Sequence, residues 1–115
     1  MKISTRLALS LCLFSPTAIA QDAESSAEFI GRCRSGLNNP NKIADLMFCA
    51  GFVTGVTNGV LAMGAAPFCV KNPLTTEQMV RIYLKWADQN PEHWQLPRAA
   101  TVLRAFVVYY PCSER

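Results

Sequence analysis

The sequence predicts an all-α protein: a small, disulfide-stabilised bundle of about four helices that follows a cleaved export signal. Three observations lead to this prediction. Apolar residues recur at spacings of three and four residues over long segments, and no alternating strand pattern exceeds a few residues. Clusters of proline, glycine and asparagine separate these segments. The chain has 115 residues, a length that allows one small domain, and its five cysteines suggest that disulfides stabilise it.

The N-terminal segment has the pattern of a bacterial export signal. Lys2 and Arg6 begin it, residues 7–14 are apolar, and Ala18-Ile19-Ala20 fits the small-x-small cleavage motif. We therefore expect residues 1–20 to be a signal peptide cleaved after Ala20, with a single domain over residues 21–115 in the periplasm. An uncleaved membrane anchor is the alternative, but the apolar run is shorter than the roughly twenty residues that span a bilayer.

Two helices are expected in the first half of the exported domain. The first covers about residues 27–34 and ends in a turn cluster over residues 35–40, which is rich in Gly, Asn and Pro. The second covers about residues 41–63 and is apolar around much of its circumference. Its apolar positions are Ile43, Leu46, Met47, Ala50, Val53, Val56, Val60 and Leu61.

Two more helices are expected in the second half. The third covers about residues 75–89 and opens with Thr75 and Gln78, which have the spacing of a capping box. A polar-aromatic loop follows. Pro97 then suits the first turn of a fourth helix, which ends before Pro111.

Three glycines recur every fourth residue in the second helix, at Gly51, Gly55 and Gly59. Each costs roughly 1 kcal/mol relative to alanine inside a helix, so a compensating contact is needed. We expect them to be helix-packing residues, against which a neighbouring helix lies closely. A membrane helix is the rival interpretation, because such stripes also pack helices in lipid. Thr54 and Asn58 in the middle of the segment favour a core helix without stable membrane insertion.

The cysteines indicate an oxidised domain. Cys12 lies in the leader, so four remain in the exported chain, and an even number in a short exported protein is typical of disulfides. Sequence alone permits three pairings. Short loops should make the third and fourth helices antiparallel, and this geometry favours Cys33–Cys49 and Cys69–Cys112. Four free, buried thiols are the alternative.

The residue inventory argues against catalysis, metal binding and nucleic-acid binding. Eleven basic side chains against eight acidic ones become nine against eight once Lys2 and Arg6 are removed, so the domain is nearly neutral. His93 is the only histidine, and oxidised cysteines offer no thiolate nucleophile. We expect no enzyme activity, no cofactor and no bound metal.

The loop before the fourth helix is the candidate partner-binding site. An aromatic side chain among polar groups on a rigid turn is a common anchor for a protein partner. The alternative is an ordinary solvated turn, with its tryptophan folded back onto the domain. The candidate residues are Asp88, Asn90, Glu92, His93, Trp94 and Gln95.

Several motifs together resemble one bacterial family. They are FCAGFVTGVTNG over residues 48–59, Phe68-Cys69-Val70, an Asn-Pro-Glu-His loop, and a last helix that ends in Tyr110-Pro111-Cys112. The chain is in this respect similar to the Tai/Rap immunity proteins, which are small, helical and periplasmic. The best-known members protect bacteria from peptidoglycan amidases injected by type VI secretion. The resemblance implies a non-catalytic protein that binds such a toxin and blocks its substrate groove sterically.

Two other functions stay open at the level of sequence. One is a periplasmic acid-stress chaperone of the HdeA kind, which loosens at low pH and exposes apolar surface. The other is an envelope protein of unrelated role on the same scaffold. Two disulfides and a glycine-packed helix favour a stiff body, and hence the inhibitor. A homodimer is compatible with the sequence in each case.

Overall fold

The computed structural model describes residues 25–113, so the expected signal peptide and its cleavage site lie outside the described residues. The described chain forms four α-helices and no strand, which confirms the all-α fold class. The helices are α2 (Ser26–Asn38), α3 (Ile43–Ala62), α4 (Thr76–Gln89) and α5 (Arg98–Tyr109), and the short 3-10 helices Pro40–Lys42 and Pro91–His93 precede α3 and α5.

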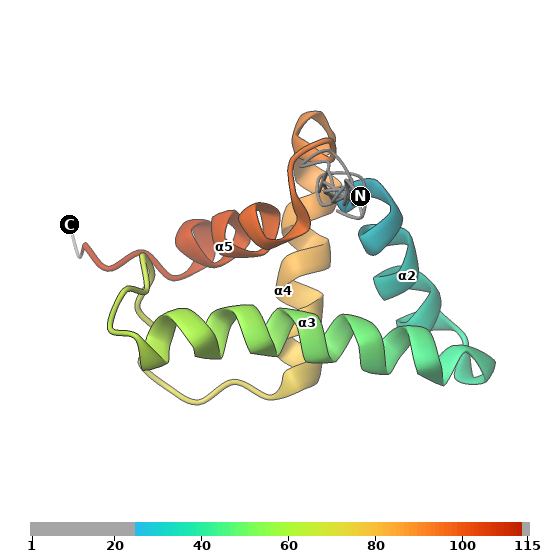
Figure 1. Cartoon of the computed structure of the whole chain (residues 1–115), viewed down its shortest axis with the longest axis horizontal. Helices are drawn as coiled ribbons and strands as arrows, with labels where there is room; N and C mark the ends of the chain where they lie inside the picture. The colour runs from blue at the N-terminus through green and yellow to red at the C-terminus, as the bar shows by residue number, and fades with distance from the viewer. Residues whose placement is uncertain (1–24, 114–115) are drawn as a thin grey trace, which may run out of the picture.

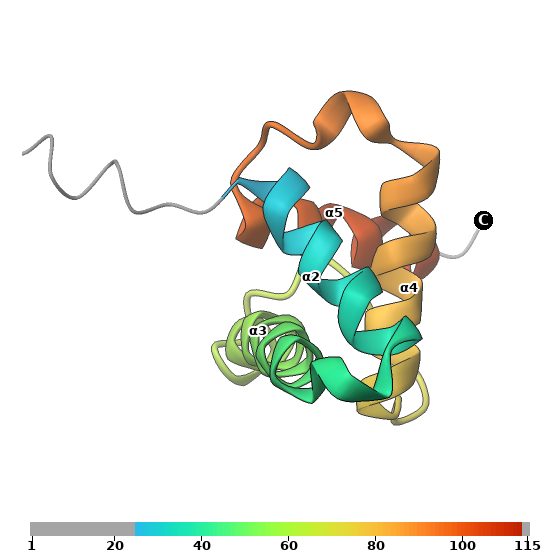
Figure 2. The same ribbon diagram turned by 90° about the vertical axis from the view of Figure 1, so that its right-hand side faces the viewer.

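Helix α4 contacts each of the other three α-helices. Helices α3 and α5 both cross it, and α2 packs on the N-terminal part of α3 (Figure 1 and Figure 2). The expected capping box opens α4: the Thr75 hydroxyl accepts from the Gln78 N–H at 3.1 Å, and the Thr75 N–H donates to the Gln78 side chain at 2.8 Å. Helix α3 forms one edge of the domain, and only one side of it is covered.

Helix α2 is longer than expected, because residues 35–38 continue the helix where a turn was predicted. The reason is a long-range contact at Gly36. A side chain there would place its Cβ only 2.4 Å from the backbone nitrogen of Leu46, so the absence of a side chain lets α2 and α3 touch. The turn is confined to Asn39 and the 3-10 helix after it.

The core fills the space between the four helices. Aromatic rings make up much of it: the ring centroids of Phe29 and Tyr83 are 5.6 Å apart, and those of Phe68 and Phe106 are 5.3 Å apart. The largest fully buried apolar side chains are Tyr83, Phe29, Phe68, Phe106, Ile30, Val53, Val80 and Val102.

A buried polar network joins three of the helices. The Tyr83 hydroxyl lies 2.8 Å from the hydroxyl of Thr101, which in turn lies 3.1 Å from that of Ser26. Burial raises the pKa of Tyr83, and its hydrogen bonds to Thr101 and Ser26 lower it in part. Every buried side-chain nitrogen or oxygen in the described chain has a hydrogen-bond partner.

The disulfides are Cys33–Cys49 and Cys69–Cys112, as the helix geometry favoured. The reasoning behind the second pair was wrong in one respect: α5 crosses α4 at a steep angle instead of running antiparallel to it (Figure 1). Cys69 reaches Cys112 because the loop before α4 passes the end of α5, where the Cys69 N–H donates to the Tyr110 carbonyl at 2.8 Å. With sequence separations of 16 and 43, loop-closure entropy assigns the two bridges about 3 and about 4 kcal/mol.

Candidate interaction surface

The side of α3 that points away from the domain carries no charged residue among those described. Ten residues of this helix are exposed, nine are apolar or glycine, and the tenth is an asparagine. We call these ten residues the outward face of α3. They are Ile43, Ala44, Met47, Phe48, Gly51, Gly55, Asn58, Gly59, Leu61 and Ala62.

The three glycines of the predicted helix-packing stripe lie in this outward face, so that prediction was wrong for the isolated chain. A Cβ built on Gly51, Gly55 or Gly59 would have nothing within 4 Å, and no described helix lies against them. The phase of the helix explains this, because Cys49 is fully buried in its disulfide with Cys33. Two residues further on, at 100° per residue, Gly51 must point outward. The spacing between Cys49 and Gly51 in the sequence already implies this orientation once Cys49 is taken to be in a buried disulfide.

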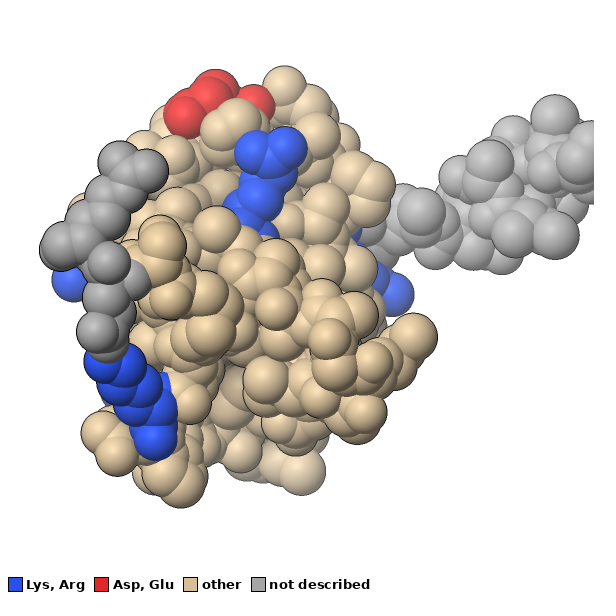
Figure 3. Space-filling model, turned by 90° about the vertical axis from the view of Figure 1, so that its left-hand side faces the viewer, with Lys and Arg blue, Asp and Glu red and all other residues tan. Residues whose placement is uncertain are grey.

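Large apolar side chains are exposed at both ends of α3. At its N-terminal end, Ile43 is 59% and Met47 67% exposed, and at its C-terminal end Leu61 is 46% and Met63 81% exposed. A surface of this kind on a small domain marks a site of interaction more often than a solvated face. From the side on which α3 ends, most of the surface is uncharged, with a few basic side chains and an acidic group at the upper edge of the view (Figure 3).

Residues 40–62 are also long and apolar enough to cross a membrane by length and composition. The inward side of α3 argues for a different role. It buries Cys49, Val53 and Thr57 against the other helices, and the Thr57 hydroxyl donates to the carbonyl of Val53 at 2.9 Å. One side of α3 therefore belongs to the protein core, and the opposite side is open.

The loop predicted to bind a partner is folded back onto the domain. The Trp94 indole N–H donates to the Ala87 carbonyl at 2.8 Å, and the Arg34 guanidinium lies 5.3 Å from the centre of its ring. Arg34 also pairs with Asp88. This is the arrangement expected of an ordinary packed turn.

The remaining candidates of this loop divide into two groups. The Asn90 amide donates to the Trp86 carbonyl at 2.8 Å, and the His93 ring stacks on Trp86 at 5.9 Å between centroids. Glu92 and Gln95 are exposed. Asp88 lies in the last turn of α4, where it is exposed but paired with Arg34, and the other five candidates follow it. Glu92 and Gln95 are the two most open to a partner, so recognition through the loop stays a prediction.

No group of three or more His, Cys, Asp or Glu side chains lies close enough to hold a metal ion within residues 25–113. What the described part of the chain offers is a disulfide-bonded helical scaffold with one long uncharged face. That combination is typical of a class of protein, the small rigid binding domain.

Residues 25–112 match the family model of the Rap1a immunity proteins, and the chain belongs to this family. This agrees with the resemblance found in the sequence as far as the immunity proteins are concerned. Membership implies a protein that binds a secreted effector protein and acts as a non-enzymatic inhibitor. No curated protein and no solved structure matches the chain.

Proposed function

We propose that this protein protects the periplasm by binding a peptidoglycan amidase delivered through type VI secretion and covering its substrate groove. The observation that carries the proposal is the family match over residues 25–112. Two disulfides are consistent with an oxidising compartment outside the cytoplasm. The amidase and the delivery route come from the resemblance of the sequence motifs to the Tai/Rap proteins.

The outward face of α3 is the surface we assign to the effector. None of its ten residues is charged, and burying an unpaired charge at an interface carries a large penalty. Cations lie near it at its Phe48 end, where the guanidinium groups of Arg32 and Arg98 lie 4.9 Å and 5.4 Å from the centre of the Phe48 ring. Its glycines would let the partner's backbone approach the helix closely, which a side chain at those positions would prevent. The Cys33–Cys49 disulfide ties α3 to α2 before binding, so little conformational entropy is lost on association.

A protection assay tests this proposal. The full chain is expressed with its own leader, together with an amidase encoded beside its gene and directed to the periplasm. We expect wild-type protein to restore growth and to form a stable complex in pull-downs from periplasmic extract. Growth arrest despite a well-expressed immunity protein would contradict the function.

A charge-insertion pair tests the surface. Gly55→Glu places a carboxylate in the outward face, and Gly31→Glu places the same group on α2, where a Cβ likewise has nothing within 4 Å. We expect the first variant to lose protection and complex formation, and the second to keep both. If Gly55→Glu protects as well as the wild type, the effector binds elsewhere, and the exposed loop residues Glu92 and Gln95 become the next sites to exchange.

A homodimer would place a second copy on the same uncharged face. Light scattering on protein purified from the periplasm measures this directly. We expect the dimer, if it forms, to be disrupted by Gly55→Glu and to compete with the effector.

A further inference from the structure

We infer that the hollow beside the C-terminal half of α3 accepts one bulky apolar side chain of the effector, presented on an uncharged stretch of peptide. We call this hollow the anchor pocket. The inference deepens the proposed function and rests on it. The pocket encloses about 380 Å³ and is formed by α3, by the loop over residues 68–74 and by the neighbouring parts of α4 and α5.

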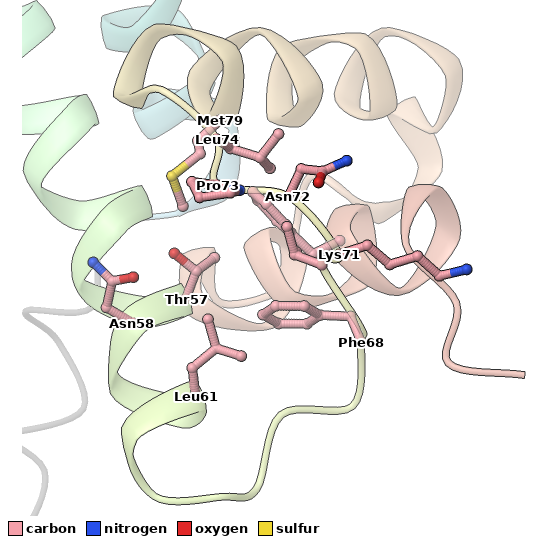
Figure 4. Close-up of a pocket in the computed structure, with 11 residues that line it drawn as sticks. Thr57, Asn58, Leu61, Phe68, Lys71, Asn72, Pro73, Leu74 and Met79 are labelled. Carbon is pink, nitrogen blue, oxygen red and sulfur yellow. The ribbon is translucent and has the colours of Figure 1, made fainter.

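The interior of the anchor pocket is apolar. Phe68 and Phe106 are almost fully buried and form its wall together with Met79. Leu61 and Thr57 point into the same space from α3 (Figure 4). The Thr57 hydroxyl is already committed to carbonyls of its own helix, at 2.9 Å from Val53 and 3.2 Å from Thr54, so a ligand meets mainly its methyl group.

The rim of the pocket carries neutral hydrogen-bonding groups. Asn58 stands on the α3 side and Asn72 on the loop side. Each carboxamide can both donate and accept, which matches the N–H and C=O of a peptide bond. The Lys71 side chain extends away from α3 (Figure 4), so no cation points into the cavity to select a carboxylate or a phosphate.

The size of the pocket fits a side chain better than a whole ligand. Pockets for small molecules range over roughly 300–1,000 Å³, and this one lies near the lower limit and is open to solvent. Interface hot spots are typically large side chains that fill pockets which lose their water when the partner binds. Tryptophan, phenylalanine and leucine are therefore the side chains that the pocket would take.

The loop that forms one wall is held in place before binding. Cys69 is tied to Cys112 by the disulfide, and its N–H donates to the Tyr110 carbonyl at 2.8 Å. A wall fixed in this way need not be ordered when the side chain enters, and this favours affinity.

The anchor pocket is continuous with the outward face of α3, and this continuity favours a protein as the occupant. Asn58 and Leu61 belong to both, so a protein lying along the face passes the mouth of the pocket. A free small molecule would fill the pocket and leave the face uncovered. A protein would cover both with one surface.

A titration without any amidase tests the pocket itself. The probes are N-acetyl-L-tryptophanamide and N-acetyl-L-leucinamide, with N-acetylglycinamide as the probe that lacks a side chain. In ¹H–¹⁵N spectra of the full exported protein, we expect saturable shifts at Asn58, Leu61 and Val70 for the first two probes only. Dissociation constants on the order of 1 mM are expected for groups of this size.

Matched variants locate the binding. Leu61→Trp fills the pocket from α3, and Met63→Trp adds the same indole at the end of that helix, outside the pocket lining. We expect Leu61→Trp to weaken the leucinamide probe at least tenfold and Met63→Trp to leave it unchanged. Should Leu61→Trp fail to fold by circular dichroism, Asn58→Trp closes the mouth from an exposed position. Absence of saturable shifts in the wild type, or equal binding by the filled variants, overturns the pocket and leaves the proposed function intact.

The protection assay connects the pocket to the effector. We expect Leu61→Trp to lose protection and the α2 variant Gly31→Glu, which lies outside the outward face, to retain it. Full protection by a folded Leu61→Trp variant, or a small molecule found in the pocket by native mass spectrometry, would refute the effector as occupant. If the wild-type protein itself gives no protection, the proposed function is refuted. The assignment of the effector's side chain to the anchor pocket is then refuted as well, whatever the probe titrations show.

Discussion

Replacing Gly51, Gly55 and Gly59 by alanine should stabilise the isolated domain and weaken its complex with the effector. All three lie inside α3, and the single described glycine with a positive φ is Gly64, so alanine is compatible with the backbone at each site. An added Cβ would meet nothing within 4 Å. The helix propensity of alanine is more favourable than that of glycine by about 0.8–1.0 kcal/mol per position. The free energy of unfolding of the triple variant should therefore rise by about 2.5–3 kcal/mol.

Urea unfolding of the oxidised protein, followed by circular dichroism, measures this gain. In thermal unfolding the same change corresponds to roughly 10–20 °C in Tm for a domain of this size. Two single variants calibrate it. Gly31→Ala should gain about 1 kcal/mol because its surroundings are open, whereas Gly36→Ala should lose about 1–3 kcal/mol, since its Cβ would lie 2.4 Å from the Leu46 nitrogen.

Binding to the amidase separates the two effects of the triple variant. We expect its affinity to fall while that of Gly31→Ala is unchanged, because only the former adds atoms to the outward face. A triple variant less stable than the wild type would refute the reasoning, since it would mean that these glycines pack closely against another part of the chain. If a homodimer uses this face, the gain should shrink as protein concentration rises.

Three further predictions address the scaffold. Exchanging Cys69 and Cys112 together for alanine should lower the free energy of unfolding by about 4 kcal/mol in urea, while retention of full stability would show that the loop is held without the bridge. Tyr83 has a raised pKa in the folded state, so its contribution to stability is complete below pH 10 and is lost as the pH rises further; Tyr83→Phe should remove this alkaline loss from the pH dependence of unfolding. Trp94→Ala should cost about 2–3 kcal/mol of stability, because the ring is half-buried and its N–H is bonded to a carbonyl; loss of binding at unchanged stability would instead favour the recognition loop.

Local signals in the sequence predicted the elements of the fold well. The capping box at Thr75 and the proline at position 97 act within a few residues, so they carry the same meaning in the sequence and in the folded chain. The disulfide pairing was predicted correctly, but the Cys69–Cys112 pair rested on an antiparallel arrangement of α4 and α5 that the structure does not have. The capping box and the proline required no knowledge of how the helices cross.

The features that failed depend on long-range packing. Residues 35–38 look like a turn because glycine has a poor helix propensity. In the folded chain, the close contact between Gly36 and the Leu46 backbone offsets this unfavourable propensity. The glycines of α3 look like a packing stripe because the helix is apolar on all sides, which leaves its phase undetermined by periodicity. The loop before α5 looked open because sequence does not show that the Trp94 indole finds a carbonyl acceptor seven residues earlier.

Helix α3 carries three exposed glycines, and the close contact made by Gly36 suggests why they are there. Inside a helix they cost the isolated domain about 3 kcal/mol relative to alanine, a considerable fraction of the 5–15 kcal/mol that usually holds such a domain together. Gly36 shows what offsets such a cost in this protein, since it allows a backbone to approach where a methyl group could not. No part of the described chain supplies that contact at Gly51, Gly55 and Gly59. A partner that lies against the outward face would supply this contact. The three glycines therefore destabilise the isolated domain, and their cost is offset only in a complex.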